Sequence, residues 1–210
     1  MPKIGTKKYY EAYAKISLID IYNKKLKSAK TTDKESPDIQ DDLNNIGIEV
    51  TRSSSKIKCI VDSISNNLFN KGYKLDELKS IINKNYKSFN GNIGQIDNIN
   101  YISPHKGLIN NSTILKNIKN SIIKKSKLFY DHYKIYNEND LYIFTGDSTL
   151  NICDIQEIID NLQNAKIPFN KIFINCIDKI FIWDKDSIVQ KNINIEKLKY
   201  YKLEAINYRE

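Results

Sequence analysis

The chain has few of the residues that define several classes of protein. Its 210 residues include three cysteines, Cys59, Cys153 and Cys176, which are widely spaced and form no CxxC pair. We therefore expect reduced, mostly buried thiols rather than disulfides or a cysteine-bound metal, which favours the cytoplasm. No apolar run approaches the roughly 18 residues of a membrane-spanning helix, and residues 1–10 lack the apolar core of a secretory signal. We expect a soluble protein with no membrane partner.

Nucleotide-binding motifs and several hydrolytic motifs are absent as well. The sequence contains no HExxH, no GxSxG and no paired cysteine and histidine ligand set, which argues against zinc and serine hydrolases. The segment GNIG at 91–94 matches neither a phosphate-binding loop nor a dinucleotide fingerprint. We therefore expect no nucleotide cofactor.

Arginine is scarce, although the chain is basic. Only Arg52 and Arg209 occur, so lysine supplies almost all of the positive charge behind the formal net charge of +8. Residues 111–136 contain six basic side chains and one acidic side chain, which concentrates positive charge on one predicted helix. This pattern favours nucleic acid as the partner. A solvated lysine face without a ligand is the alternative.

Periodicity and turn signals predict an α/β protein. Apolar residues at helical spacing predict helices over 7–27, 54–70, 75–86, 112–133, 154–164 and near 195–202. Alternating or short apolar runs predict strands over 36–40, 46–51, 141–145, 171–175 and 179–183. Loops are expected over 28–36 and 87–110. Asp154 is the predicted N-cap of its helix, with Glu157 as its third-residue partner.

Two acids on the first predicted hairpin are candidates for metal binding. Asp38 and Glu49 lie on short strands that a tight turn joins, so their carboxylates can point toward one position from one face. Mg²⁺ prefers a few carboxylate oxygens and keeps several waters. An unrelated pair of surface acids beside a turn is the alternative.

A lysine on the helix over 112–133 strengthens this interpretation. At 3.6 residues per turn, Lys125 lies within the apolar face formed by Ile118, Ile122 and Phe129. A lysine that points into the interior requires an anion or loses its proton, and Asp38 or Glu49 would supply that anion. The alternative is that the Lys125 side chain extends to the edge of the helix and reaches solvent.

The segment Pro37-Asp38, ten further residues and then Glu49-Val50-Thr51 resembles the PD-(D/E)XK motif of restriction-endonuclease-like nucleases. The core of that family is a helix, a three-stranded antiparallel meander, a helix and a further strand, and the predicted elements follow a similar order. The resemblance implies an α/β fold with a restriction-endonuclease-like core, in which helices flank a central mixed sheet. It also implies one domain over 1–210, with 53–110 as a helical insertion.

The chain departs from the motif at its last position, where Thr51 replaces lysine. Some members of the superfamily carry that lysine on the helix after the sheet, where Lys125 lies, and several add a metal-binding glutamate from the first helix. The resemblance thus implies Asp38 and Glu49 as metal ligands, Lys125 as charge stabiliser, Glu11 as an auxiliary acid, and Thr51 and Gln40 as supporting groups.

The leading hypothesis is a Mg²⁺-dependent endonuclease that hydrolyses DNA phosphodiester bonds, such as a restriction, defence or mobile-element nuclease, with Mn²⁺ able to substitute. Cleavage of both strands requires two active sites, so a homodimer is expected. The expected DNA contacts are Lys116, Lys124, Lys127 and Arg52. One alternative is a catalytically inactive nuclease fold that binds nucleic acid or a partner protein. Another is a structural or regulatory protein that binds no nucleic acid.

Overall fold

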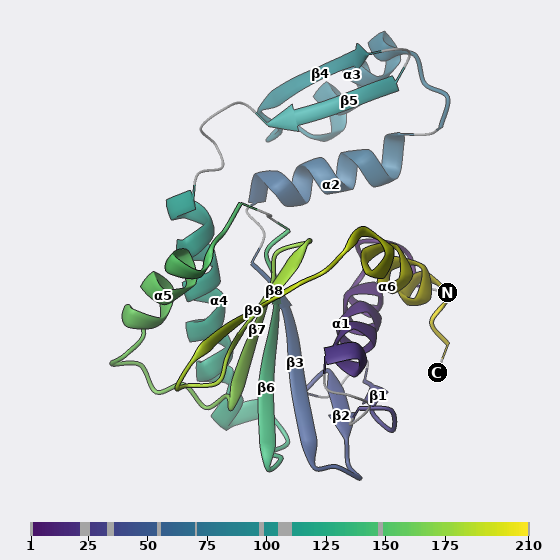
Figure 1. The fold of residues 1–210 in the computed structure, drawn as a ribbon. Coiled ribbons are helices and arrows are strands. Elements are labelled where there is room, and N and C mark those ends of the chain that lie inside the picture. Colours follow the sequence, from purple (N-terminus) through teal and green to yellow (C-terminus); the bar gives the residue numbers. More distant parts are fainter. Residues whose placement is uncertain are drawn as a thin grey trace. The chain divides into compact units, whose positions relative to one another are not determined.

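The computed structural model describes residues 2–21, 26–32, 36–53, 56–69, 71–96, 99–104, 111–146 and 149–209. The chain forms two compact units (Figure 1). One comprises Met1–Ser53 and Leu115–Glu210, and the other comprises Ser54–Ile114. Within the described parts of the chain, no helix is long and apolar enough to span a bilayer.

A seven-stranded mixed sheet forms the centre of the first unit. Its strands lie in the order β1-β2-β3-β6-β7-β8-β9. Their bounds are Lys30–Thr31 (β1), Ile39–Asp41 (β2), Ile46–Arg52 (β3), Glu138–Phe144 (β6), Lys171–Asn175 (β7), Lys179–Trp183 (β8) and Ile188–Asn192 (β9). The first three strands form an antiparallel meander, β3, β6 and β7 are parallel, and β7, β8 and β9 are antiparallel.

Helices cover both faces of this sheet, with α1 and α6 on one side and α4 and α5 on the other (Figure 1). They span Lys7–Ile21 (α1), Asn111–His132 (α4), Ile152–Asp160 (α5) and Ile195–Asn207 (α6). Tyr13 and Leu18 of α1 pack with Tyr201 of α6 against Ile48 and Tyr142 of the sheet. The central strand β6 is buried from Asn139 to Phe144, as expected where layers cover both faces.

The phase of α4 agrees with the apolar periodicity of its sequence. Ile118, Ile122 and Phe129 are buried. The three lysines predicted to point away from this stripe, Lys116, Lys124 and Lys127, are exposed. The long helix is therefore an amphipathic element of the core layer, with most of its charge toward solvent.

The second unit differs from its prediction. It contains α2 (Lys56–Leu68) and α3 (Leu75–Asn85), as expected, but the predicted loop over 87–110 contains an antiparallel hairpin of β4 (Gly91–Ile96) and β5 (Ile99–Pro104). The insertion is thus not purely helical. Gly94 faces the ring of Tyr101, where a Cβ atom would lie 2.5 Å from the ring carbons. This glycine permits close packing within a strand rather than marking a loop.

Further corrections concern element ends and short strands. The described part of α1 ends at Ile21, with 22–25 outside the described residues. Strand β1 lies in the predicted loop over 28–36, β9 was not predicted because its pattern is largely exposed and polar, and α6 is longer than predicted. The N-cap of α5 is Asn151, whose side chain accepts from the backbone amides of Cys153 and Asp154.

Two of the three cysteines can be compared with the prediction of mostly buried thiols. Cys176 is buried, but Cys153 is exposed on the first turn of α5. It was predicted to be buried because cysteine is usually an interior residue, but here it lies on the outer side of the helix. The side chain of Cys59 lies outside the described residues.

Candidate active site

The pairing of β2 with β3 brings the two predicted acids together. Ile39 pairs with Ile48, so the antiparallel register continued by one residue places Asp38 opposite Glu49. Their side chains reach different helices, because Asp38 contacts Lys7 of α1 and Glu49 contacts Lys125 of α4. Both residues are buried at 3% relative exposure, and the charge of Asp38 contributes to the raised pKa of Glu49. The two carboxylates therefore lie close enough for the charge of Asp38 to act on Glu49.

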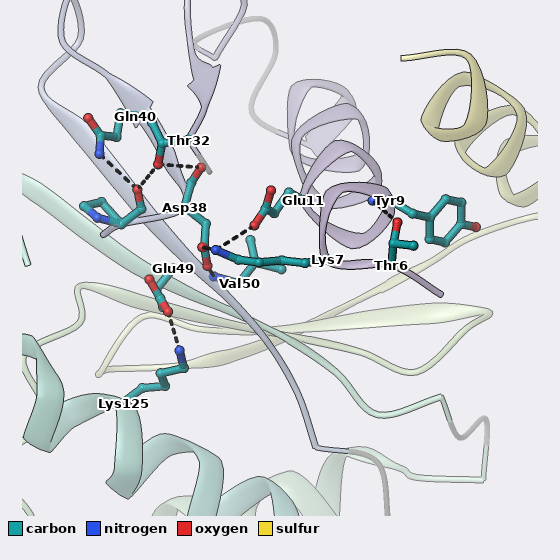
Figure 2. A network of polar contacts seen from close by, with 11 residues as sticks. Thr6, Lys7, Tyr9, Glu11, Thr32, Asp38, Gln40, Glu49, Val50 and Lys125 are labelled. Carbon is teal, nitrogen blue, oxygen red and sulfur yellow. Dashed lines mark hydrogen bonds and ion pairs between the residues drawn. The ribbon is translucent and has the colours of Figure 1, made fainter. Parts of the chain in front are cut away.

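Asp38 is held by contacts from two elements. Its Oδ2 accepts a hydrogen bond of 2.9 Å from the backbone amide of Val50, and its Oδ1 forms an ion pair of 2.8 Å with Lys7 Nζ (Figure 2). The amide fixes the carboxylate to β3, while Lys7 comes from the first turn of α1. Sequence reasoning missed Lys7 because nothing in its neighbourhood marks it as different from other lysines of this basic chain.

Lys125 meets Glu49 across the layer between α4 and the sheet. Its Nζ donates to Glu49 Oε1, and the Lys125 side chain is 21% exposed (Figure 2). Burial is the main cause that raises the pKa of Glu49, followed by the charge of Asp38, while Lys125 acts in the opposite direction. The helical phase thus located the contact between a lysine of α4 and the acids of the hairpin. The chemical roles of these residues remain predictions.

Glu11 joins the same group from α1. It is buried at 1% relative exposure, and its Oε1 lies 3.2 Å from Lys7 Nζ, so Lys7 lies between Glu11 and Asp38 (Figure 2). Burial, together with the nearby charge of Asp38, raises the pKa of Glu11 to about 7. Glu11 therefore carries a proton for part of the time near neutral pH.

Three buried oxygens around this group make no hydrogen bond within the described residues: Glu11 Oε1, Glu49 Oε2 and the Tyr133 hydroxyl. Tyr133 follows α4, and the backbone amide of Lys134 donates to Ser36 O at 3.0 Å, which ties this end of α4 to the segment before Asp38. Burial and the charge of Glu49 raise the pKa of Tyr133. The Tyr133 hydroxyl and Glu49 lie near enough to influence each other's pKa, and Glu11 Oε1 lies beside Lys7 Nζ.

The two predicted supporting residues lie near the acids. Gln40 Nε2 donates to Pro37 O at 3.1 Å, and Gln40 Oε1 accepts from the Tyr136 hydroxyl at 3.0 Å, so Gln40 holds the turn that carries Asp38. Thr51 lies on the same face of β3 as Glu49, two residues away. Sequence reasoning did not identify Tyr133 or Tyr136, since tyrosine is common in this chain and its spacing gave no signal.

The four predicted DNA-contact residues lie outside this acid cluster. Lys116, Lys124 and Lys127 are exposed on α4, and the Arg52 guanidinium lies 4.5 Å from the ring centroid of Tyr10. Their role as DNA contacts stays a prediction.

The donors present suit a hard divalent cation. Among the described residues, no three His, Cys, Asp or Glu side chains form a cluster that would hold a metal by themselves. Mg²⁺ is bound in many proteins through one or two carboxylates, with waters or substrate phosphates completing its shell. Asp38 and Glu49 meet this requirement, and the unpaired Glu49 Oε2 is an oxygen that such an ion would satisfy.

Comparison of the whole chain with protein-family models, with curated proteins and with solved structures gives no match in any of the three. The assignment of a function therefore depends on the geometry of this site.

Proposed function

We propose that this protein is a Mg²⁺-dependent nuclease that hydrolyses phosphodiester bonds of DNA. The observation that carries the proposal is the proximity of Asp38, Glu49 and Lys125, which come from three segments of the chain: the charge of Asp38 acts on Glu49, and Lys125 Nζ donates to Glu49 Oε1. Two carboxylates can hold a hard cation, and an amine beside them can stabilise negative charge on a phosphate.

The arrangement of the elements supports the same proposal. In chain order, α1, the antiparallel meander β1-β2-β3, α4 and the parallel strand β6 follow the order expected of a PD-(D/E)XK core. Asp38 directly precedes the second strand of the meander, Glu49 lies on the third strand, and Lys125 lies on α4. The unit formed by Ser54–Ile114 is inserted between that meander and most of α4.

Each residue has a role that follows from its contacts. Asp38 and Glu49 would hold the metal, which when bound lowers the pKa of a water and neutralises charge on the phosphate. Lys125 places an ammonium group beside Glu49, where it would contact a phosphate oxygen and stabilise the extra negative charge of the transition state. In the reaction, a water oxygen bonds to phosphorus and gives up one proton to solvent while the bond from phosphorus to the leaving oxygen breaks, and the leaving oxygen takes up one proton from solvent.

The exposed lysines of α4 would position the duplex. Lys116, Lys124 and Lys127 are exposed on α4, as expected of contacts to a phosphate backbone. Because cleavage of both strands requires two sites, we expect the active form to be a homodimer.

Plasmid cleavage tests the proposal most directly. We expect nicking and linearisation with Mg²⁺ or Mn²⁺ and none with EDTA, and a loss of about 100-fold or more in Asp38→Asn, Glu49→Gln and Lys125→Met. Lys119→Met is a matched control because it removes the same charge from the same helix at a residue with no assigned role. Cleavage by Glu49→Gln at the wild-type rate would exclude the assigned site.

A second function is favoured by one specific feature, since Thr51 occupies the place where the motif has lysine. In that case the protein would be an inactive nuclease fold that binds nucleic acid or a partner protein. Salt-sensitive retention of DNA, without cleavage by any metal, is the result that would support it.

A further inference from the structure

Lys7 is arranged differently from every other charged group of the candidate site. Its Nζ lies 2.8 Å from Asp38 Oδ1 and 3.2 Å from Glu11 Oε1, so one ammonium group contacts two buried carboxylates from different elements (Figure 2). Its own side chain is 61% exposed, whereas those of Asp38 and Glu11 are 4% and 2% exposed. The charged end is therefore inside the site while the stem remains in water.

Electrostatics explains why a cation occupies this position. Two carboxylates that lie together in a buried place repel each other, and a positive charge between them reduces that repulsion. An ammonium group is a compact point charge on a flexible stem, so it can fill such a place without a fixed geometry. Because most of the stem is already in solvent, moving Lys7 outward would expose little additional apolar surface.

Lys125 provides the contrast within the same site. Only 21% of its side chain is exposed, and it contacts Glu49 alone among the acids. It is packed into the apolar face of α4, with Ile118, Ile122 and Phe129 buried along that face. Lys125 is thus fixed by packing, while Lys7 is held mainly by charge.

The unpaired oxygens show that Lys7 does not satisfy the site completely. Glu11 Oε1 lies within ion-pair distance of Lys7 but makes no hydrogen bond, and the buried Glu49 Oε2 also makes none. A hard divalent cation takes several oxygen ligands at once. The site therefore offers more carboxylate oxygens than one ammonium group contacts.

We propose that the Lys7 ammonium is the exchangeable counter-ion of this site, which a divalent cation displaces when it binds to Asp38. This inference rests on the proposed function, since it takes Asp38 as a metal ligand. Lys7 then competes with the metal, so it weakens metal binding while it stabilises the metal-free protein. A lysine with a purely structural role would stabilise the fold without any opposite effect on the metal.

Direct binding of Mn²⁺ without DNA tests this competition. Calorimetry, or the electron paramagnetic resonance signal of free Mn²⁺, would compare wild type with Lys7→Met, Lys7→Arg, Lys8→Met and Asp38→Asn. We expect Lys7→Met to bind Mn²⁺ about tenfold more tightly, because the competing charge is gone. Lys8→Met removes the same charge one residue away and should change the affinity by about twofold or less. Lys7→Arg keeps the charge and should bind no more tightly than wild type.

Thermal unfolding gives a second readout that does not depend on activity. Without metal, Lys7→Met should melt below wild type, and excess Mn²⁺ should raise its Tm by more than it raises that of wild type. Equal or weaker Mn²⁺ binding by Lys7→Met, with binding abolished in Asp38→Asn, would overturn the competition and leave the nuclease proposal standing. Absence of Mn²⁺ binding in every variant would overturn both.

Discussion

Two lysines reach one group of buried acids, and they differ in how deeply they are set. Lys125 is largely enclosed and contacts Glu49, while Lys7 is mostly in solvent and contacts Asp38 and Glu11. The same charge therefore has different energetic weight in the two places. When an exposed lysine is removed, water can take its place beside the carboxylate. When an enclosed lysine is removed, water reaches the buried carboxylate poorly. We infer that Lys125 is part of the framework of the site and that Lys7 is an adjustable part of it.

The largest effect should come from Lys125→Met, because it leaves the buried Glu49 carboxylate without its cation. We expect the free energy of unfolding to fall by about 3 kcal/mol, against about 1 kcal/mol or less for Lys7→Met, whose lysine is exposed. Urea unfolding followed by circular dichroism at neutral pH measures both. Adding Glu49→Gln to Lys125→Met should recover part of the loss. Equal losses in the two single variants would remove the distinction between the lysines.

A smaller effect concerns pH and arises from Glu11. Its pKa is raised from 4.5 to about 7 in the folded protein, so the folded state binds this proton more tightly than the unfolded state. The stability that this proton contributes is complete below about pH 4.5 and is lost as pH rises through 7. Glu11→Gln, which stays neutral, should unfold like wild type near pH 5 and should be more stable by about 2 kcal/mol near pH 8.

Urea unfolding of wild type and Glu11→Gln at several pH values between 5 and 8 checks this prediction. Glu11→Ala serves as a control for packing, because it also removes the titrating carboxyl but leaves a cavity, so its stability should lie below that of Glu11→Gln by a similar amount at every pH. A constant difference between wild type and Glu11→Gln over the whole range would contradict the assigned pKa. The Lys7 ammonium beside Glu11 lowers the pKa of this carboxyl, but burial and the charge of Asp38 raise it by more.

The fold and the site could be predicted from the sequence to different extents. The hairpin of β2 and β3 and the phase of α4 follow from local periodicity, so the meeting of Glu49 with Lys125 could be predicted. The hairpin of β4 and β5 could not, because glycine within a strand gives the same signal as glycine within a loop. Lys7 and Tyr133 were missed for another reason. Their roles depend on how α1 and the end of α4 pack against the meander, and no local sequence pattern predicts that packing.

A third kind of lysine completes the comparison and gives the smallest expected effect on the fold. Lys127 is exposed on α4, so Lys127→Met should change the free energy of unfolding by no more than about 0.5 kcal/mol. Its effect should appear in DNA binding, where loss of one phosphate contact reduces the slope of log K against log salt by about 0.9. Fluorescence anisotropy with a labelled duplex and Ca²⁺ in place of Mg²⁺, over a series of salt concentrations, measures that slope. The same slope in wild type and Lys127→Met would show that this face of α4 does not contact the phosphate backbone. That result would not affect the comparison of Lys125 with Lys7, because the stability measurements on those two lysines do not involve DNA.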